Sequence, residues 1–140
     1  MSTAENKNKD LVCQYFEVFH NERRLDIGER ILESELLEPT LGVAATLCTA
    51  FPDYQFTIEE QLAEADRVAT VWTGTGTHQG DWASPIGPVP ATGKAVTWTG
   101  TTTLRIVEGK IAQVIGSNWD HLGILQQLGA LPAVAPRSGA

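Results

Sequence analysis

The hydrophobic pattern of this chain changes period at Pro52-Asp53, a turn-forming pair. Over residues 9–51 the apolar side chains recur every three or four positions, as on one face of a helix. Over residues 54–119 they partly alternate, and Val, Thr and Trp are abundant, which is typical of strands. Helices followed by a strand meander predict an α+β fold, in which helices cover one face of an antiparallel sheet.

The individual elements follow from the same patterns. We expect helices over residues 9–20, 25–32, 41–51 and 121–128, with Pro39 closing the segment before the third and Gly129 ending the last. We expect strands over residues 54–63, 67–78, 94–107 and 111–119, and a long Gly- and Pro-rich loop over residues 80–93. Residues 1–131 are predicted to form one domain with a frayed start over residues 1–8, and residues 132–140 a disordered tail.

Glycines lie inside three of the predicted strands, at Gly74, Gly76, Gly100 and Gly116. Glycine in a strand permits sharp bends and leaves open space beside the backbone. We therefore expect a curled sheet that the N-terminal helices close into a cone, with a cavity inside.

Composition narrows the possible partners. The 140 residues carry a net charge of -7, and a surface this acidic repels phosphate backbones and anionic lipids. No apolar run is long enough to cross a bilayer, and the polar start lacks the apolar stretch of a signal peptide. The only cysteines, Cys13 and Cys48, are expected to be buried thiols. We therefore predict a cytoplasmic protein that binds neither nucleic acid nor membrane.

Motifs for cofactors and metals are absent from the sequence. The run Gly74-Thr75-Gly76-Thr77-His78 lacks the spacing of a dinucleotide-binding loop, and no helix follows it. There is no phosphate-binding loop and no nucleophile elbow, and the three histidines lack metal-ligand spacing. We expect neither cofactor nor metal, which leaves acid–base chemistry or binding.

The strand pattern predicts where a site would lie. Strict alternation over residues 111–119 places Asn118 and Asp120 on one wall with small residues, and Ser117 and Trp119 on the other side. Thr102 and His78 add polar groups from the neighbouring strands. The expected walls are aromatic, with Trp72 and Trp98 from the sheet, Tyr15, Phe16 and Phe19 from the first helix, and Trp82 as a lid on the Gly/Pro loop.

Asp120 is the strongest candidate for acid–base catalysis, because burial in an apolar cavity raises the pKa of a carboxyl group toward the working range of a general acid or base. An alternative is that Asp120 only caps the helix that follows it. His78 is either a cavity residue or a hydrogen-bonded histidine at a strand end, and the tryptophans are either ligand platforms or core.

The second half of the chain resembles the SnoaL-like polyketide cyclase family. The resemblance rests on four segments that match in order, residues 76–80, 90–94, 104–111 and 119–129, the last reading Trp119-Asp120-His121-Leu122-Gly123 at its start. It implies the cone-shaped α+β barrel shared with scytalone dehydratase and ketosteroid isomerase, a dimer, and cofactor-free cyclisation of polyketide intermediates, with the family's acid/base aspartate at Asp120. The family's histidine on the preceding strand is replaced here by Thr102.

Three functions remain open from the sequence. The leading hypothesis is an enzyme that closes a ring in an aromatic polyketide by intramolecular aldol chemistry, with Asp120 as acid/base and Asn118, Thr102 or His78 as donors to the enolate oxygen. The alternatives are a hydroxylase of a similar substrate, working with a separate reductase, and a protein that binds a small apolar molecule without catalysis. A flat, semi-polar outer sheet face, built from alternate threonines of residues 97–103 with Ile111, Gln113 and Ile115, predicts a homodimer.

Overall fold

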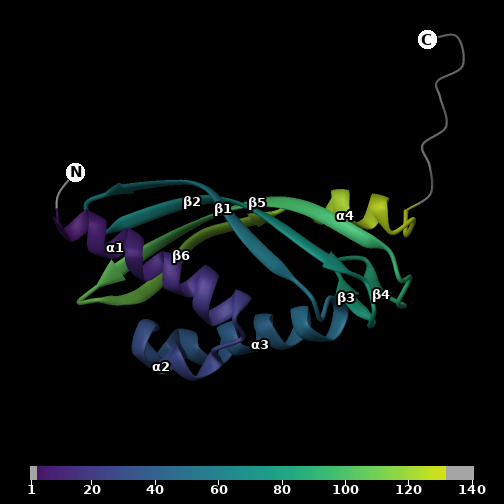
Figure 1. Cartoon of the computed structure of the whole chain (residues 1–140), viewed down its shortest axis with the longest axis horizontal. Helices are drawn as coiled ribbons and strands as arrows, with labels where there is room; N and C mark the ends of the chain where they lie inside the picture. The colour runs from purple at the N-terminus through teal and green to yellow at the C-terminus, as the bar shows by residue number, and fades with distance from the viewer. Residues whose placement is uncertain (1–2, 132–140) are drawn as a thin grey trace, which may run out of the picture.

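A computed structural model of the chain describes residues 3–131. The helices come first: α1 (Thr3–Cys13), η1 (Gln14–Asn21), η2 (Leu25–Ile27), α2 (Gly28–Ile31) and α3 (Ser34–Ala50). The strands follow as β1 (Gln55–Glu64), β2 (Arg67–Thr77), β3 (Trp82–Ser84), β4 (Gly87–Val89), β5 (Ala95–Val107) and β6 (Lys110–Trp119), before α4 (His121–Gln127). Figure 1 shows this arrangement, with α1, α2 and α3 on one side of the sheet and α4 apart from them near β5. The predicted α+β fold is confirmed.

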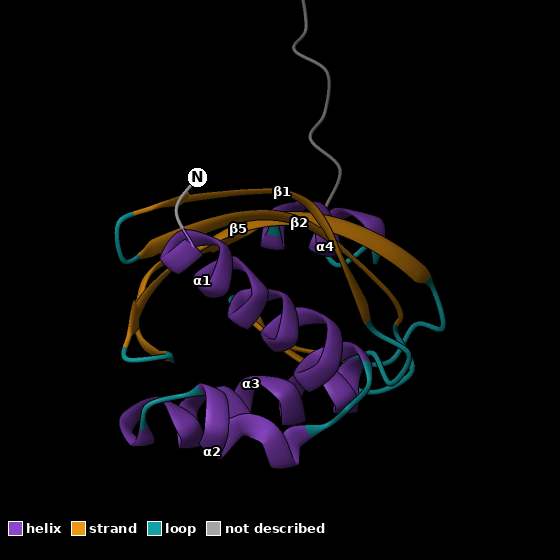
Figure 2. Cartoon of the chain, turned by 60° about the vertical axis from the view of Figure 1, so that its left-hand side comes forward, coloured by secondary structure: helices purple, strands orange, loops and turns teal. Residues whose placement is uncertain are grey.

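The long strands form one antiparallel sheet in the order β1-β2-β5-β6. Long in-register pairing joins β2 to β5, from Arg67 opposite Arg105 to Thr77 opposite Ala95. The predicted hairpin between β5 and β6 is confirmed, with Glu108 and Gly109 at positive φ in its turn. The sheet curls over the helices without closing on itself (Figure 2).

The N-terminal helices differ from the prediction at three points. The helix begins at Thr3 instead of fraying over residues 1–8, and the Glu5 carboxylate accepts a hydrogen bond from the Ala65 backbone N–H at 3.1 Å. The π-helix η1 then continues α1 with wider turns. Pro39 lies inside α3, where the packing of apolar side chains such as Leu36 and Leu37 against the core offsets the missing N–H.

Two further expectations, the long loop and the buried cysteines, are corrected. Residues 80–93, predicted to be a loop, contain a small hairpin in which Trp82 pairs with Val89 and Ser84 with Gly87. Cys13 and Cys48 are free thiols that are only partly buried. The predicted disordered tail lies outside the described residues.

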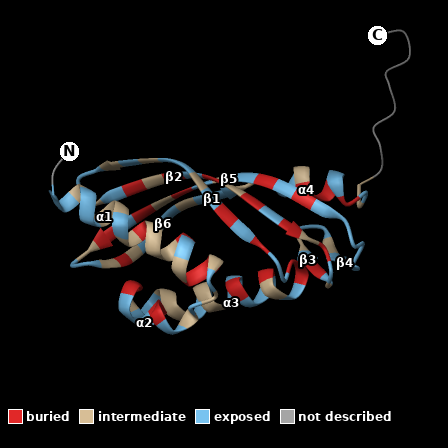
Figure 3. Ribbon diagram, in the orientation of Figure 1, coloured by how far each residue is buried: buried red, intermediate tan, exposed pale blue. Residues whose placement is uncertain are grey.

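The core fills the concave face of the sheet. Buried and exposed residues alternate along β2 and β5 (Figure 3), and the buried set includes Trp72 and Trp98. Glycines on facing strands leave the room that these rings need: a Cβ on Gly74 would overlap the Trp98 ring, and a Cβ on Gly100 would overlap the Trp72 ring. The strand glycines therefore serve tight aromatic packing as well as curvature.

The predicted side-chain directions on β6 are wrong for most of the strand. Two irregularities interrupt its pairing with β5. Thr103 and Leu104 are successive residues of β5, but they pair with Gly116 and Val114, which skips one residue of β6. A second residue is skipped where Arg105 and Ile106 pair with Gln113 and Ile111. Each bulge adds one residue and reverses the alternation. As a result Ser117 shares the concave side with its partner Thr102, while Asn118 lies opposite the exposed Thr101.

Candidate active site

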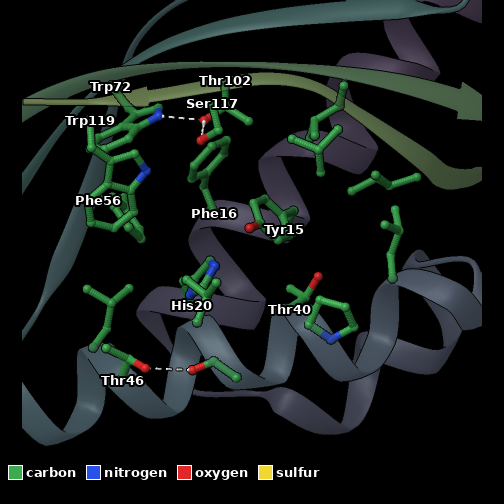
Figure 4. Close-up of a pocket in the computed structure, with 18 of the residues that line it drawn as sticks. Tyr15, Phe16, His20, Thr40, Thr46, Phe56, Trp72, Thr102, Ser117 and Trp119 are labelled. Atoms are coloured by element: carbon green, nitrogen blue, oxygen red, sulfur yellow. Dashed lines mark hydrogen bonds between the residues drawn. The ribbon is translucent and has the colours of Figure 1, made fainter. Parts of the chain in front are cut away.

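A cavity of about 690 Å³ lies between the concave face of the sheet and the N-terminal helices. Aromatic and aliphatic side chains make up most of its lining, and its volume is in the range of small-molecule sites. Figure 4 shows Trp72, Thr102 and Ser117 on the sheet side and His20 and Thr46 on the helix side. The polar groups of the mostly apolar lining therefore lie on two sides, one formed by the sheet and one by the helices.

On the sheet side, three side chains form a hydrogen-bonded chain. The Trp72 Nε1–H donates to Thr102 Oγ1 at 2.9 Å, and Thr102 Oγ1 lies 3.2 Å from Ser117 Oγ (Figure 4). Since the Thr102 oxygen accepts from Trp72, its own hydroxyl proton is free to donate to Ser117. The pair of hydroxyl groups marks one polar point of the cavity.

On the helix side, His20 and Tyr15 come from the π-helix η1. The wider turns of η1 bring both side chains against the core, with the His20 and Tyr15 ring centroids 4.8 Å apart. His20 Nδ1 lies 2.9 Å from the Tyr54 hydroxyl oxygen, and His20 is 1% exposed. The Arg23 guanidinium lies over the Tyr54 ring, 3.7 Å from its centroid. His20, Tyr54 and Arg23 are therefore one connected group.

Burial sets the protonation of these side chains. It lowers the pKa of His20 to about 3, with a further lowering by the positive charge of Arg23. Burial also raises the pKa of Tyr15 to about 12, and it raises the pKa of Tyr54 against the opposing effect of Arg23. All three side chains are neutral at pH 7.

Five of the residues predicted for the cavity wall line the cavity: Tyr15, Phe16, Trp72, Trp82 and Thr102. Phe19 and Trp98 do not, and both are buried in the core. Phe19 stacks on Tyr15 at 5.8 Å between ring centroids, and Trp98 stacks on Trp119 at 5.9 Å. These two side chains support the cavity wall from behind.

The structure does not bring the three predicted catalytic residues together. Asp120 is exposed and caps α4, with its carboxylate accepting from the Gly123 N–H at 2.9 Å. Asn118 points to the outer face because of the β6 bulges. His78 is fully buried at the end of β2, where its Nδ1 accepts from the Thr92 N–H at 3.2 Å, and its ring lies 5.5 Å from that of the cavity-lining Phe51.

Sequence reasoning missed much of the cavity lining, including Ser117, Trp119, His121 and His20. Ser117 and Trp119 were placed on the wrong side by strict alternation on β6, and His121 follows Trp119 with its ring stacked at 5.9 Å. His20 was not singled out, although it lies four residues after Phe16 on the apolar side of the first helix. That spacing was the available signal, because a polar side chain on an apolar helix face must be buried with a partner.

Among the described residues, no three His, Cys, Asp or Glu side chains lie close enough together to hold a metal ion. None of the helices in residues 3–131 is long and apolar enough to cross a membrane.

Solved structures with the same fold are numerous. A proposed SnoaL-like polyketide cyclase from Jannaschia sp. CCS1 has a TM-score of 0.81 at 20% identity, covering 94% of this chain and 98% of that one. AclR of Streptomyces galilaeus, a proposed hydroxylase, has a TM-score of 0.75 at 28% identity, covering 94% and 86%. IdmH of Streptomyces antibioticus, a proposed polyketide cyclase, has a TM-score of 0.69 at 24% identity, covering 87% and 98%.

Sequence comparison gives the family. The comparison with curated proteins finds no match to this chain. The family profile described as SnoaL-like polyketide cyclase matches residues 37–128, which include most of α3, the whole sheet and α4. The chain therefore belongs to the SnoaL-like polyketide cyclase family.

Proposed function

We propose that the protein closes a ring in an aromatic polyketide intermediate by an intramolecular aldol reaction without a cofactor. A base removes a proton from a carbon next to a carbonyl group, the resulting enolate carbon attacks a second carbonyl carbon of the same molecule, and the new alkoxide takes up a proton. No electrons are gained or lost overall. The observation that carries the proposal is the cavity of about 690 Å³, whose apolar wall has hydroxyl groups only at a few points. It suits a flat substrate with few polar atoms.

Asp120 is the proposed acid/base residue, by its match to the family's aspartate. Its two neighbours in the chain, Trp119 and His121, both line the cavity, while the Asp120 side chain is exposed and is not one of the lining residues. In the described structure this carboxylate is occupied by the cap of α4, so the proposal requires it to reach the substrate from that position. Thr102 and Ser117, which line the cavity, are proposed as donors to the enolate oxygen. Asn118 and His78 are not among the lining residues, so the geometry does not favour either as a donor.

Hydroxylation of an aromatic polyketide is the second candidate. It is favoured by the 28% identity to the proposed hydroxylase AclR, and by Thr102 in place of the family's histidine. This reaction inserts one atom of molecular oxygen into the substrate and reduces the other to water. It needs two electrons, which a separate nicotinamide- or flavin-dependent reductase would supply.

A mass measurement separates the two candidates. The protein is incubated with a linear polyketide intermediate under nitrogen, and in air with a reductase, and the product mass is recorded. Unchanged mass with a new ring, or loss of water, under nitrogen supports cyclisation. A gain of one oxygen atom in air alone contradicts it and supports hydroxylation, while binding without turnover contradicts both.

We also propose that the protein is a homodimer joined through the outer face of the sheet. That face carries exposed apolar side chains on neighbouring strands, including Leu62 and Val71, beside the exposed threonines 97, 99 and 101. Ile111, which strict alternation predicts on this face, lines the cavity instead. Light scattering at micromolar concentration should give twice the chain mass of 15.1 kDa, and a mass of one chain would contradict the proposal.

A further inference from the structure

We propose that His20 is a catalytic residue: a neutral imidazole whose Nε2–H holds the substrate's carbonyl oxygen during ring closure, with Tyr54 and Arg23 as its positioning residues. The assignment rests on the proposed function for the reaction that it serves. The geometry itself stands independently of that reaction.

The two ring nitrogens of His20 have different surroundings. Nδ1 is held by the Tyr54 hydroxyl group at 2.9 Å. Nε2 has no hydrogen-bond partner among residues 3–131. In this part of the chain, the unpartnered nitrogens that are fully enclosed are His78 Nε2 and Trp98 Nε1, so His20 Nε2 is not fully enclosed. His20 lines the cavity on its helix side, below Phe16 and Tyr15 (Figure 4). Nε2 is therefore the nitrogen that a cavity ligand reaches.

Arg23 fixes the partner of Nδ1. Its guanidinium donates to four backbone oxygens, those of His20, Asn21, Pro52 and Tyr54, at distances of 2.5 to 3.2 Å. Arg23 has a φ of 58°, in the left-handed region that is unfavourable for a residue with a side chain. These contacts join the end of η1 to the start of β1 and hold a positive charge against the face of Tyr54.

That charge favours one tautomer of His20. A cation over the ring of a phenol makes its O–H a stronger donor, so Tyr54 donates to Nδ1 and the imidazole proton lies on Nε2. The titratable or charged side chains that face His20 are Tyr15 from η1, Arg23 from the following turn and Tyr54, with Cys48 of α3 next to Tyr54. The low pKa of His20, about 3, agrees with a ring that stays neutral throughout the physiological range.

A neutral imidazole suits the chemistry of ring closure. The carbonyl oxygen becomes negatively charged as its carbon is attacked, and a fixed N–H donor in a dry cavity stabilises that charge more than it stabilises the bound substrate. An imidazolium would give up its proton too readily to act only as a donor, whereas a neutral ring transfers none. Thr102 and Ser117 lie on the opposite wall, so a flat substrate between the two walls has a polar contact on each side (Figure 4).

The first test changes His20 itself. His20→Leu should lower kcat about 100-fold with KM within about threefold, the usual cost of losing one donor to a developing oxyanion, and His20→Gln, which keeps an N–H at a similar reach, should recover part of the loss. Near-ultraviolet circular dichroism checks that both variants fold. A folded His20→Leu variant with kcat close to that of the wild type would overturn the proposal.

The second test changes the positioning residues. Tyr54→Phe keeps the ring beneath Arg23 but frees Nδ1, and Arg23→Lys keeps the charge but loses the planar set of donors. Both should lower kcat more than they raise KM. Arg24→Lys is the matched control, because Arg24 is exposed and pairs only with Asp26 among the described side chains. Equal kinetics for the Arg23 and Arg24 variants would contradict the role of Arg23.

A third measurement needs no turnover. Nitrogen-15 NMR of the histidine rings, assigned with His20→Gln, should show a proton on Nε2 and none on Nδ1 of His20 between pH 5 and 7. Tyr54→Phe should change that pattern, and a hydroxyanthraquinone probe should shift the Nε2–H signal. A protonated Nδ1, or an unmoved signal with the probe bound, would overturn the proposal. If the wild type fails to cyclise any polyketide while the NMR result holds, the proposed function fails and the His20 donor stands.

Discussion

The Asp120 carboxylate accepts a hydrogen bond from the Gly123 N–H at 2.9 Å and so caps the start of α4. The two residues are packed closely, because a Cβ on Gly123 would lie 2.7 Å from the Asp120 Cγ. The same carboxylate is the proposed acid/base group of the reaction. A cap and a catalyst respond differently to one conservative substitution, so the two roles can be separated.

Asp120→Asn should keep the fold, because Asn is about as good a helix N-cap as Asp. Turnover should fall roughly 100-fold, the usual contribution of positioned proton transfer, since an amide cannot exchange the proton. Thermal unfolding and steady-state kinetics of the purified variant check both parts.

Asp120→Ala is the control for the cap and should lose about 1 kcal/mol of unfolding free energy. If Asp120→Asn turns over substrate like the wild type while Asp120→Ala is less stable, Asp120 is a cap alone. The acid/base role then falls, and the polar groups inside the cavity remain.

Gly100→Ala should destabilise the fold. Its Cβ would overlap the Trp72 ring and lie 2.7 Å from the Asn118 backbone oxygen, so the ring or the strand has to move, which costs on the order of 1–3 kcal/mol. Gly116→Ala is the matched control on the neighbouring strand, because nothing lies within 4 Å of its Cβ position. Chemical denaturation of both variants measures the difference, and equal losses would show that Trp72 does not depend on Gly100 for space.

The periodicity of the sequence was enough for the element order, the sheet and most of its buried face. Val68, Trp72 and Gly76 lie on one side of β2, and this side is buried, as regular alternation predicts. Regular alternation holds there because β2 pairs with β5 without interruption. On β6 it fails, since a bulge depends on the partner strand and leaves no pattern in the residues of one strand.

The site was harder to predict for a related reason. Its helix-side polar group joins His20 and Arg23 to Tyr54, about 30 residues further along the chain. Two of the contacts within this group run from Arg23 to the backbone oxygens of His20 and Tyr54, which carry no side-chain signal. The prediction of α3 failed for the opposite reason. Pro39 is a strong local signal for the end of a helix, but tertiary packing keeps it inside α3. Local rules therefore located the walls of the cavity more accurately than its polar contacts.

Trp82 should respond to ligand binding. It lines the cavity from the β3–β4 hairpin and stacks on His121 at 6.2 Å between ring centroids, so a ligand that enters changes its surroundings. With 5-fluorotryptophan incorporated, the fluorine-19 resonance assigned by Trp82→Phe should shift and sharpen when a hydroxyanthraquinone binds, as a lid that becomes ordered would. The Trp98 resonance is the internal comparison, since Trp98 does not line the cavity. An unchanged Trp82 signal at saturation would contradict the lid.

The stability of the protein should fall as the pH drops from about 6.5, before its carboxylates begin to titrate. Burial and the nearby Arg23 lower the pKa of His20 to about 3, whereas in the unfolded chain it has the ordinary value of about 6.5. Between these values the unfolded chain binds the proton and the folded one does not, so the unfolding free energy increases with pH. The contribution of His20 is complete above about pH 6.5 and is lost progressively below it, by up to about 1.4 kcal/mol per pH unit. Asp26, Asp53 and Asp66 also have lowered pKa values, but their contributions are lost only below about pH 4.

Urea denaturation at several values between pH 4.5 and 6.5 isolates the His20 effect. The wild type should lose stability steadily across this interval, and His20→Gln, which has no titrating ring at this position, should show a flatter curve. Parallel curves for the two proteins would mean that His20 takes up its proton in the folded state as readily as in the unfolded one, and the neutral imidazole on the cavity wall would be contradicted with it.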